Sequence, residues 1–531
     1  MLRPLAPTFL ASLLAPLAAA QELPRPATAA EASAFERTSS AAEVAAFLTA
    51  LADLPHGDRL QVSVCGHSHG GRDLQLVRAA LPDTDEATAL RALVIASIHA
   101  GECEGKEAVQ QIARELAAGD HEDLLRAAVL YFVPIYNVDG NEATALTNRP
   151  RQNGPDLCGE RHNGIGLDLN RDFVKAEAEE TRALLGLFER LDPHLFLDLH
   201  TTNGSMHGYH LTYAPPLSTN VDPAVATLSR ALLDEVTAAL QTATPAYRTF
   251  DYGNFETRDW DGGGAPESKD DVRGWWSYDH RARYGVNYFG LRNRIGVLSE
   301  AYSYCDFATR IAATRAFVLG VLGRATARRD EVLATCAAAD RRLAQPDAPC
   351  YFGFDTVFAP PESMAVLVGE CDRIELDGDR GPRFARKDVA IPEVMPVFRR
   401  FTSRRQLALP TAWALPDPPD EVVQLLTRHG VVFERVSEPR RVRAERFAVE
   451  ARRKPKRPFQ GHQELILVGR YAPPEEIDLP AGALWIAANQ RLARLAAQLL
   501  EPQSEDSLSS WNFLEDRTAD HYPVVRIVDA R

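Results

Sequence analysis

Four strongly apolar runs constrain the fold of this chain more than any other feature, and they lie at residues 93–98, 127–133, 195–199 and 295–299. Each run has the length of one strand and lacks the regular alternation of polar and apolar residues that marks a strand with one exposed face. Stretches of helical composition separate the runs. Strands that are buried on both faces and alternate with helices predict the α/β class, here a mixed, largely parallel twisted sheet with helices on both faces.

Three of these runs lead into a side chain that can take part in hydrolysis. His99 follows the first run, His200 the third and Glu300 the fourth, and Glu102 lies three residues after His99. Ligands collect beyond the carboxyl ends of parallel strands, and positions i and i+3 of a helix share a face. The His99–Glu102 spacing alone is weak, because a chain with 14 histidines contains about one such pair by chance and a surface histidine before a helix-starting glutamate is the simpler reading. Three such strand ends together predict a hydrolytic zinc site.

Two further motifs complete a pattern that resembles a known family. The matching pieces stand in one order along the chain: His-Ala-Gly-Glu at residues 99–102, Asn-Val-Asp-Gly at 137–140, Asp-Leu-Asn-Arg at 168–171, His200 and Glu300. In this order they make roughly residues 55–325 similar to the carboxypeptidase A-like zinc metallocarboxypeptidases. The resemblance implies the α/β fold of that family and removal of C-terminal residues from peptides.

The resemblance also implies one zinc ion per chain, held by His99, Glu102 and His200. Zinc lowers the pKa of a bound water to about 7, so hydroxide is available at neutral pH. Glu300 would be the general base that takes the proton of the water and later donates it to the leaving amine. A surface charge is the other reading of Glu300, but its neighbours in the sequence are apolar, and an unpaired carboxylate is costly in such surroundings.

Other positions in the matching motifs imply how a peptide is held. Asp168 would accept the second ring N–H of His99 and so orient this ligand. Asn170 and Arg171 would receive the free C-terminal carboxylate, because the planar guanidinium fork suits a carboxylate better than an ammonium group does.

Two assignments stay open between neighbouring residues. A further arginine is expected to polarise the scissile carbonyl; Arg151 matches best by its Pro-Arg-Gln-Asn pattern, and Arg149 is the alternative. A tyrosine that caps the substrate falls on Tyr278 by its spacing from Glu300, with Tyr288 as a rival. Both tyrosines are also compatible with a plain core position.

At 531 residues the chain is too long for one ordinary core, which predicts at least two domains. We expect a catalytic domain over residues 21–350 and a smaller β-rich or α+β accessory domain over residues 351–531. Residues 1–20 have a basic start, an apolar core and three alanines before Gln21, which predicts a secretory signal peptide cleaved near Ala20. We therefore expect a secreted or periplasmic protein, without a membrane span.

The formal net charge of −14 argues against nucleic acid as the main partner. We interpret the chain as an exported zinc metallocarboxypeptidase whose partner is a peptide with a free C-terminus. One alternative keeps the zinc chemistry in an amidase or deacylase that acts on cell-wall peptides or acylated amino acids. A second alternative is a catalytically silent peptide-binding module, although such a module needs neither an intact ligand set nor Glu300. The sequence carries no signal for an oligomeric state.

Overall fold

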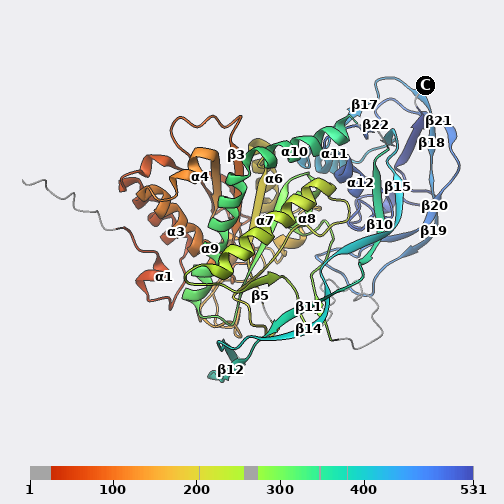
Figure 1. Ribbon diagram of the computed structural model, residues 1–531. Helices are drawn as coiled ribbons and strands as arrows, with labels where there is room; N and C mark the ends of the chain where they lie inside the picture. Colours follow the sequence, from red (N-terminus) through yellow and green to blue (C-terminus); the bar gives the residue numbers. More distant parts are fainter. Residues whose placement is uncertain (1–24, 203, 256–272, 346–348, 379–380, 530–531) are drawn as a thin grey trace, which may run out of the picture.

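The computed structural model describes residues 25–202, 204–255, 273–345, 349–378 and 381–529 (Figure 1). The predicted signal peptide at residues 1–20 lies outside the described residues. Within the described part of the chain, no helix is both long enough and apolar enough to cross a lipid bilayer.

An eight-stranded mixed sheet forms the centre of the molecule, with the strand order β1-β2-β4-β3-β5-β9-β6-β7. Its inner strands β4, β3, β5 and β9 are parallel, whereas β1, β2 and β4 pair antiparallel, as do β9 and β6. The bounds are β1 Leu60–His67, β2 Asp73–Ala79, β3 Leu90–Ala96, β4 Ala128–Val133, β5 Leu195–Thr202, β6 Leu211–Ala214, β7 Thr249–Asp251 and β9 Ile295–Tyr302. The predicted fold class is confirmed, and its physical cause is the burial of the apolar inner strands on both faces.

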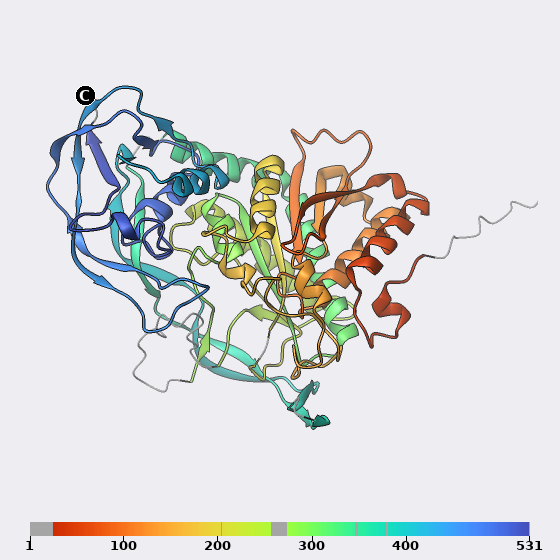
Figure 2. The same ribbon diagram turned by 180° about the vertical axis from the view of Figure 1, so that it is seen from behind.

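Helices cover both faces of this sheet (Figures 1 and 2). Helices α3, α7, α9 and α10 pack against one another on one face, and α6 and α8 lie on the other. The bounds are α1 Ala29–Ala32, α2 Ala41–Ala50, α3 Glu104–Ala118, α4 Glu122–Ala127, α5 Val138–Glu142, α6 Glu179–Leu191, α7 Pro223–Thr242, α8 Gly285–Leu291, α9 Phe307–Ala327 and α10 Arg329–Ala344.

The later part of the chain is rich in strands. Its largest sheet has six strands in the order β17-β22-β16-β23-β18-β21, with smaller pairings β10–β15, β12–β13 and β19–β20. The bounds are β10 Tyr351–Phe358, β11 Glu362–Val368, β12 Cys371–Ile374, β13 Arg383–Arg386, β14 Ile391–Phe398, β15 Phe401–Ala408, β16 Ala412–Leu415, α11 Asp420–Arg428, β17 Glu434–Arg435, β18 Arg440–Glu445, β19 Phe447–Arg453, β20 Ile466–Tyr471, β21 Glu475–Leu479, β22 Leu484–Ala487, α12 Ala493–Leu500 and β23 Val525–Asp529.

This later part is joined to the central sheet region by shared core and by a shared strand pairing. The largest buried apolar cluster contains residues of both parts, such as Phe196 and Trp413. Strand β14 pairs in parallel with β8 (Trp275–Trp276), a short strand that precedes α8 in the sequence. The predicted boundary at residue 351 coincides with the start of β10 and stays a prediction, because the packing is continuous across it.

The parallel strands bring the predicted residues to one edge of the sheet. His200 and Glu300 are register partners on the neighbouring strands β5 and β9, and both strands continue to Thr202 and Tyr302 instead of ending at the predicted positions. Strand β3 ends earlier than predicted, at Ala96, where Ser97 adopts a positive φ of 57°.

Candidate metal centre and substrate pocket

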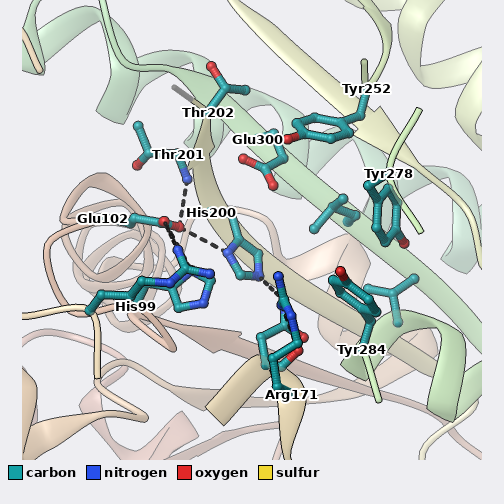
Figure 3. Close-up of a pocket in the computed structure, with 14 residues that line it drawn as sticks. His99, Glu102, Arg171, His200, Thr201, Thr202, Tyr252, Tyr278, Tyr284 and Glu300 are labelled. Carbon is teal, nitrogen blue, oxygen red and sulfur yellow. Dashed lines mark hydrogen bonds and ion pairs between the residues drawn. The ribbon is translucent and has the colours of Figure 1, made fainter. Parts of the chain in front are cut away.

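His99, Glu102 and His200 form a buried group at the carboxyl edge of the sheet. One ligand atom from each residue lies within 4.8 Å of the other two. Both histidines turn Nδ1 toward the Glu102 carboxylate, at 3.0 Å from His99 and 2.9 Å from His200 (Figure 3). The backbone N–H of Thr201 also donates to this carboxylate, over 3.0 Å. The turn after β3 and the strand β5 thus converge on one point.

Each histidine is held from behind by an aspartate. Nε2 of His99 lies 3.0 Å from Asp168 Oδ1, and Nε2 of His200 lies 2.9 Å from Asp198 Oδ2. Carboxylates in this position orient an imidazole ligand and increase its basicity. Asp198 was not among the predicted residues. The sequence could have indicated it, because Asp198 and His200 are positions i and i+2 of one strand and their side chains point to the same face.

The donor set fits zinc. Two imidazole nitrogens and one carboxylate are the ligands of catalytic zinc sites that keep a fourth position open. Because each Nε2 is engaged by an aspartate, each Nδ1 is left to face the shared centre. Burial alone would raise the pKa of Glu102, but the charges of Arg149 and His99 hold it well below its usual range, so the carboxylate is ionised as a ligand must be.

Glu300 faces the same pocket from β9. Its side chain lies between the ligand group and the tyrosines on the opposite wall (Figure 3). Burial raises the pKa of Glu300 to about 8, with the Glu102 charge adding to this effect and His200 opposing it. A carboxyl group that titrates near neutral pH is suited to proton transfer in both directions.

Asn170 and Arg171 line the pocket from a short 3₁₀ turn, Leu169–Arg171. The side-chain oxygen of Asn170 accepts the N–H of Gly285 at 2.9 Å, and its Nδ2 lies 3.4 Å from His200 Nε2. The Arg171 guanidinium stands 4.1 Å above the ring of Tyr284. These contacts set an amide and a guanidinium beside the ligand group, and their role in binding a carboxylate stays a prediction. Tyr284 was missed because nothing in its local pattern distinguishes it from a core tyrosine.

The remaining wall of the pocket is apolar and aromatic. It is formed by Tyr252, Tyr278, Tyr284, Val286 and Leu298. No hydrogen-bond partner of the Tyr278 hydroxyl lies among the described residues.

The structure separates the two candidate tyrosines. Tyr278 lines the pocket, whereas Tyr288 on α8 points into the core, where its hydroxyl lies 2.7 Å from Nδ1 of His429 beyond α11. The prediction of Tyr288 as a capping residue is therefore not supported, because α8 turns this side chain toward the interface with the later part of the chain.

The structure separates the candidate arginines as well. Arg149 Nη2 lies 2.5 Å from Glu102 Oε1, whereas no contact joins Arg151 to the ligand group. Both predicted arginines line a neighbouring cleft and not the substrate pocket, so neither is placed at the scissile carbonyl. A third arginine, Arg161, lines the pocket, donates to Asp168 over 2.8 and 3.0 Å, and approaches His99 Nδ1 to 3.3 Å. The irregular loop that carries these arginines has no periodic pattern, so the sequence could not rank them.

The later part of the chain supports the site from outside. The Gln460 side-chain oxygen accepts the N–H of Asp168 at 3.0 Å. The Phe398 carbonyl accepts the N–H of Ser277, next to Tyr278, at 2.9 Å, and the Trp276 ring stacks on Phe398 at 3.5 Å. Strand β14 and the loop at residue 460 therefore hold both the ligand side and the tyrosine side of the pocket.

Comparisons with known proteins find similarity to carboxypeptidases. The family model described as zinc carboxypeptidase matches residues 44–293. Carboxypeptidase 2 of Trichophyton tonsurans is 24% identical over 466 residues, which cover 82% of this chain and 76% of the relative. Among solved structures, a metallo-carboxypeptidase from Pseudomonas aeruginosa is 21% identical with a TM-score of 0.40, over 56% of this chain and 70% of the other. One from Burkholderia cenocepacia is 18% identical with a TM-score of 0.41, over 55% and 70%.

Proposed function

We propose that this chain, whose residues 44–293 match the zinc carboxypeptidase family model, is an exported enzyme that uses zinc as its cofactor and hydrolyses the last amide bond of peptides with a free C-terminus. One observation carries the proposal: a single pocket is lined by the zinc-ligand group, by Glu300 and by the Asn170–Arg171 pair. These are the three functions that the reaction needs, namely a metal centre, a proton carrier and a receptor for a carboxylate.

Arg171 and Asn170 would bind the C-terminal carboxylate of the peptide. Contact with the Tyr284 ring and the hydrogen bond to Gly285 fix the two side chains before substrate arrives, so little side-chain entropy is lost on binding. The side chain of the last residue would then lie against the aromatic and apolar wall, with Tyr278 beside it.

Zinc held by His99, Glu102 and His200 would supply a Lewis acid that polarises the scissile carbonyl and acidifies water. Glu300 would take the proton of the attacking water and pass it to the leaving amine, and its raised pKa allows it to hold that proton at neutral pH. The guanidinium of Arg161, which lines the pocket and lies 3.3 Å from His99 Nδ1, would stabilise negative charge on the carbonyl oxygen.

Glu300→Gln tests the role of the base. We expect kcat to fall by about 10²–10⁴-fold, the loss typical of a missing general base, while KM and zinc content stay those of the wild type. A variant that keeps its turnover would show that the proton is carried by another group. A variant that loses zinc would show that Glu300 acts as a ligand.

A pair of peptides that differ only in a free or amidated C-terminus tests the substrate class. We expect hydrolysis of the free peptide alone, because only a carboxylate can pair with Arg171. In Arg171→Met the KM for the free peptide should rise, and the amidated peptide should still not be hydrolysed. Equal hydrolysis of both peptides by the wild type would favour the amidase or deacylase reading instead.

The proposal of export rests on the pattern of residues 1–20. Mature protein recovered outside the cytoplasm should begin at Gln21. Recovery of the chain only inside the cytoplasm, with its first residues intact, would contradict the export proposal and leave the catalytic one unaffected.

A further inference from the structure

A second cleft lies beside the ligand group. It is lined by Asn148, Arg149, Pro150, Arg151, Gln152, Gly204 and Ser303, none of which lines the substrate pocket. Arg149 connects the two hollows, because it lines this cleft while its guanidinium pairs with Glu102 and donates to the Thr201 carbonyl. We call this hollow the Arg151 cleft.

The residues that line the pocket and the cleft give the direction in which a bound peptide runs. Thr201 and Thr202 line the pocket and Gly204, two residues later, lines the cleft; Glu300 lines the pocket and Ser303 lines the cleft. A peptide whose carboxylate lies at Arg171 and whose last amide lies at the ligand group leaves that group on the Arg149 side. The Arg151 cleft therefore lies on the path of the residues that precede the scissile bond.

The cleft offers a positive charge without a negative partner. Arg151 is exposed, and none of the described residues forms a hydrogen bond or ion pair with its side chain, whereas Arg149 and Arg161 are paired with Glu102 and Asp168. The Arg151 carbonyl accepts the N–H of Phe384, which anchors its backbone to β13. No aspartate or glutamate is among the lining residues.

A buried hydroxyl gives a second, independent indication that the cleft receives a polar group. Ser303 is 3% exposed, and its Oγ has no hydrogen-bond partner among the described residues. Buried polar atoms are nearly always satisfied, so an unpartnered hydroxyl at the wall of a cleft points to a ligand that satisfies it.

We propose that the Arg151 cleft binds the residues just before the scissile bond and selects an acidic side chain there, with Arg151 as the specificity-determining residue. The inference rests on the proposed peptidase function and adds its substrate class, peptides with glutamate or aspartate near the C-terminus. A carboxylate in the cleft pairs with the Arg151 guanidinium, and Ser303 is positioned to donate a hydrogen bond to the peptide.

Synthetic peptides with the same last residue, and with Glu, Gln or Lys at the second or third position from the end, test this inference. For the wild type we expect kcat/KM to be about two- to fivefold higher for Glu than for Gln, the range of a partly exposed ion pair, and lowest for Lys. The difference should lie in KM, because the contact is remote from the reacting atoms, and it should shrink at high salt.

Two variants of Arg151 test its effect on substrate preference, and a third variant controls for the change in net charge. Arg151→Gln should abolish the preference for Glu over Gln, and Arg151→Glu should reverse the order of Glu and Lys. Arg404→Glu on β15 makes the same change in net charge at another exposed arginine and should keep the wild-type order.

Equal rates for all three peptides in the wild type, or the wild-type order in Arg151→Glu, would overturn the inference. Hydrolysis without discrimination would leave the peptidase proposal intact. Failure to hydrolyse any peptide with a free C-terminus would overturn that proposal instead.

Discussion

Replacing Arg283 with methionine tests whether the later part of the chain holds the tyrosine wall of the pocket. Arg283 precedes Tyr284, and its side chain is 3% exposed. Its Nε donates to Asp506 Oδ1 and its Nη2 to Glu464 Oε1, each over 2.7 Å, while its backbone N–H donates to Asp506 Oδ2 over 2.9 Å. The segment with Tyr284 is thus tied to two carboxylates of the later part, the buried Asp506 and the partly buried Glu464.

The size of the effect follows from what the substitution leaves behind. Removing one partner of a buried ion pair costs about 3–5 kcal/mol, because the other partner stays buried without compensation. Methionine keeps much of the apolar stem of Arg283, so little cavity is added. Burial already raises the pKa of Asp506 against the influence of Arg283, so in the variant this carboxyl group takes up a proton and the loss stays near the lower limit, about 3 kcal/mol.

Urea unfolding followed by tryptophan fluorescence measures this loss, since Trp511 lies 4.7 Å from the Arg283 guanidinium. We also expect KM for a free peptide to rise, because Tyr284 lies under Arg171, while zinc content stays unchanged. In the double variant Arg283→Met/Asp506→Leu part of the stability should return, because the buried Asp506 charge is removed together with that of Arg283 and only the partly buried Glu464 loses its partner.

Arg441→Met is the matched control, because the pair of Arg441 with Asp478 is about two-thirds exposed. This variant should unfold almost as the wild type does. If Arg283→Met were no less stable than Arg441→Met, or had an unchanged KM, the argument that the later part of the chain holds the pocket would be refuted.

Two further predictions concern the same interface. The Glu177 carboxylate, 2.8 Å from His462 Nε2, raises the pKa of His462, so this pair should stabilise the protein fully below the ordinary histidine pKa of about 6.5 and lose its effect as pH rises through the raised value. On the acid side His462 and Lys175 lower the pKa of Glu177 against the effect of burial, so the stabilisation by the pair is also lost as pH falls below the ordinary glutamate range. The difference in Tm between wild type and His462→Gln should therefore be largest in weakly acid solution. A difference that does not change with pH would contradict the assignment. Tyr278→Phe should change KM and leave Tm nearly unchanged, whereas Tyr288→Phe, which leaves a buried histidine nitrogen unsatisfied, should cost about 1–3 kcal/mol of stability without changing KM.

The sequence by itself determined the class of fold and the central residues of the site. Apolar runs that alternate with helices specify a buried parallel sheet, because such strands can lie only between two helical layers. The i, i+3 spacing of His99 and Glu102 is local geometry, and His200 and Glu300 follow strands whose carboxyl ends must meet at one edge. These relations need no knowledge of distant contacts.

Only the tertiary structure decided which of several equivalent side chains reach the site. Arg149 and Arg151 are two residues apart in an irregular loop, and the conformation of that loop turns the guanidinium of Arg149 toward Glu102 and leaves Arg151 exposed. The contacts of Gln460 with Asp168 and of Phe398 with Ser277 join residues far apart in the chain. Such pairings depend on how two packed surfaces meet, and no local period in the sequence encodes them.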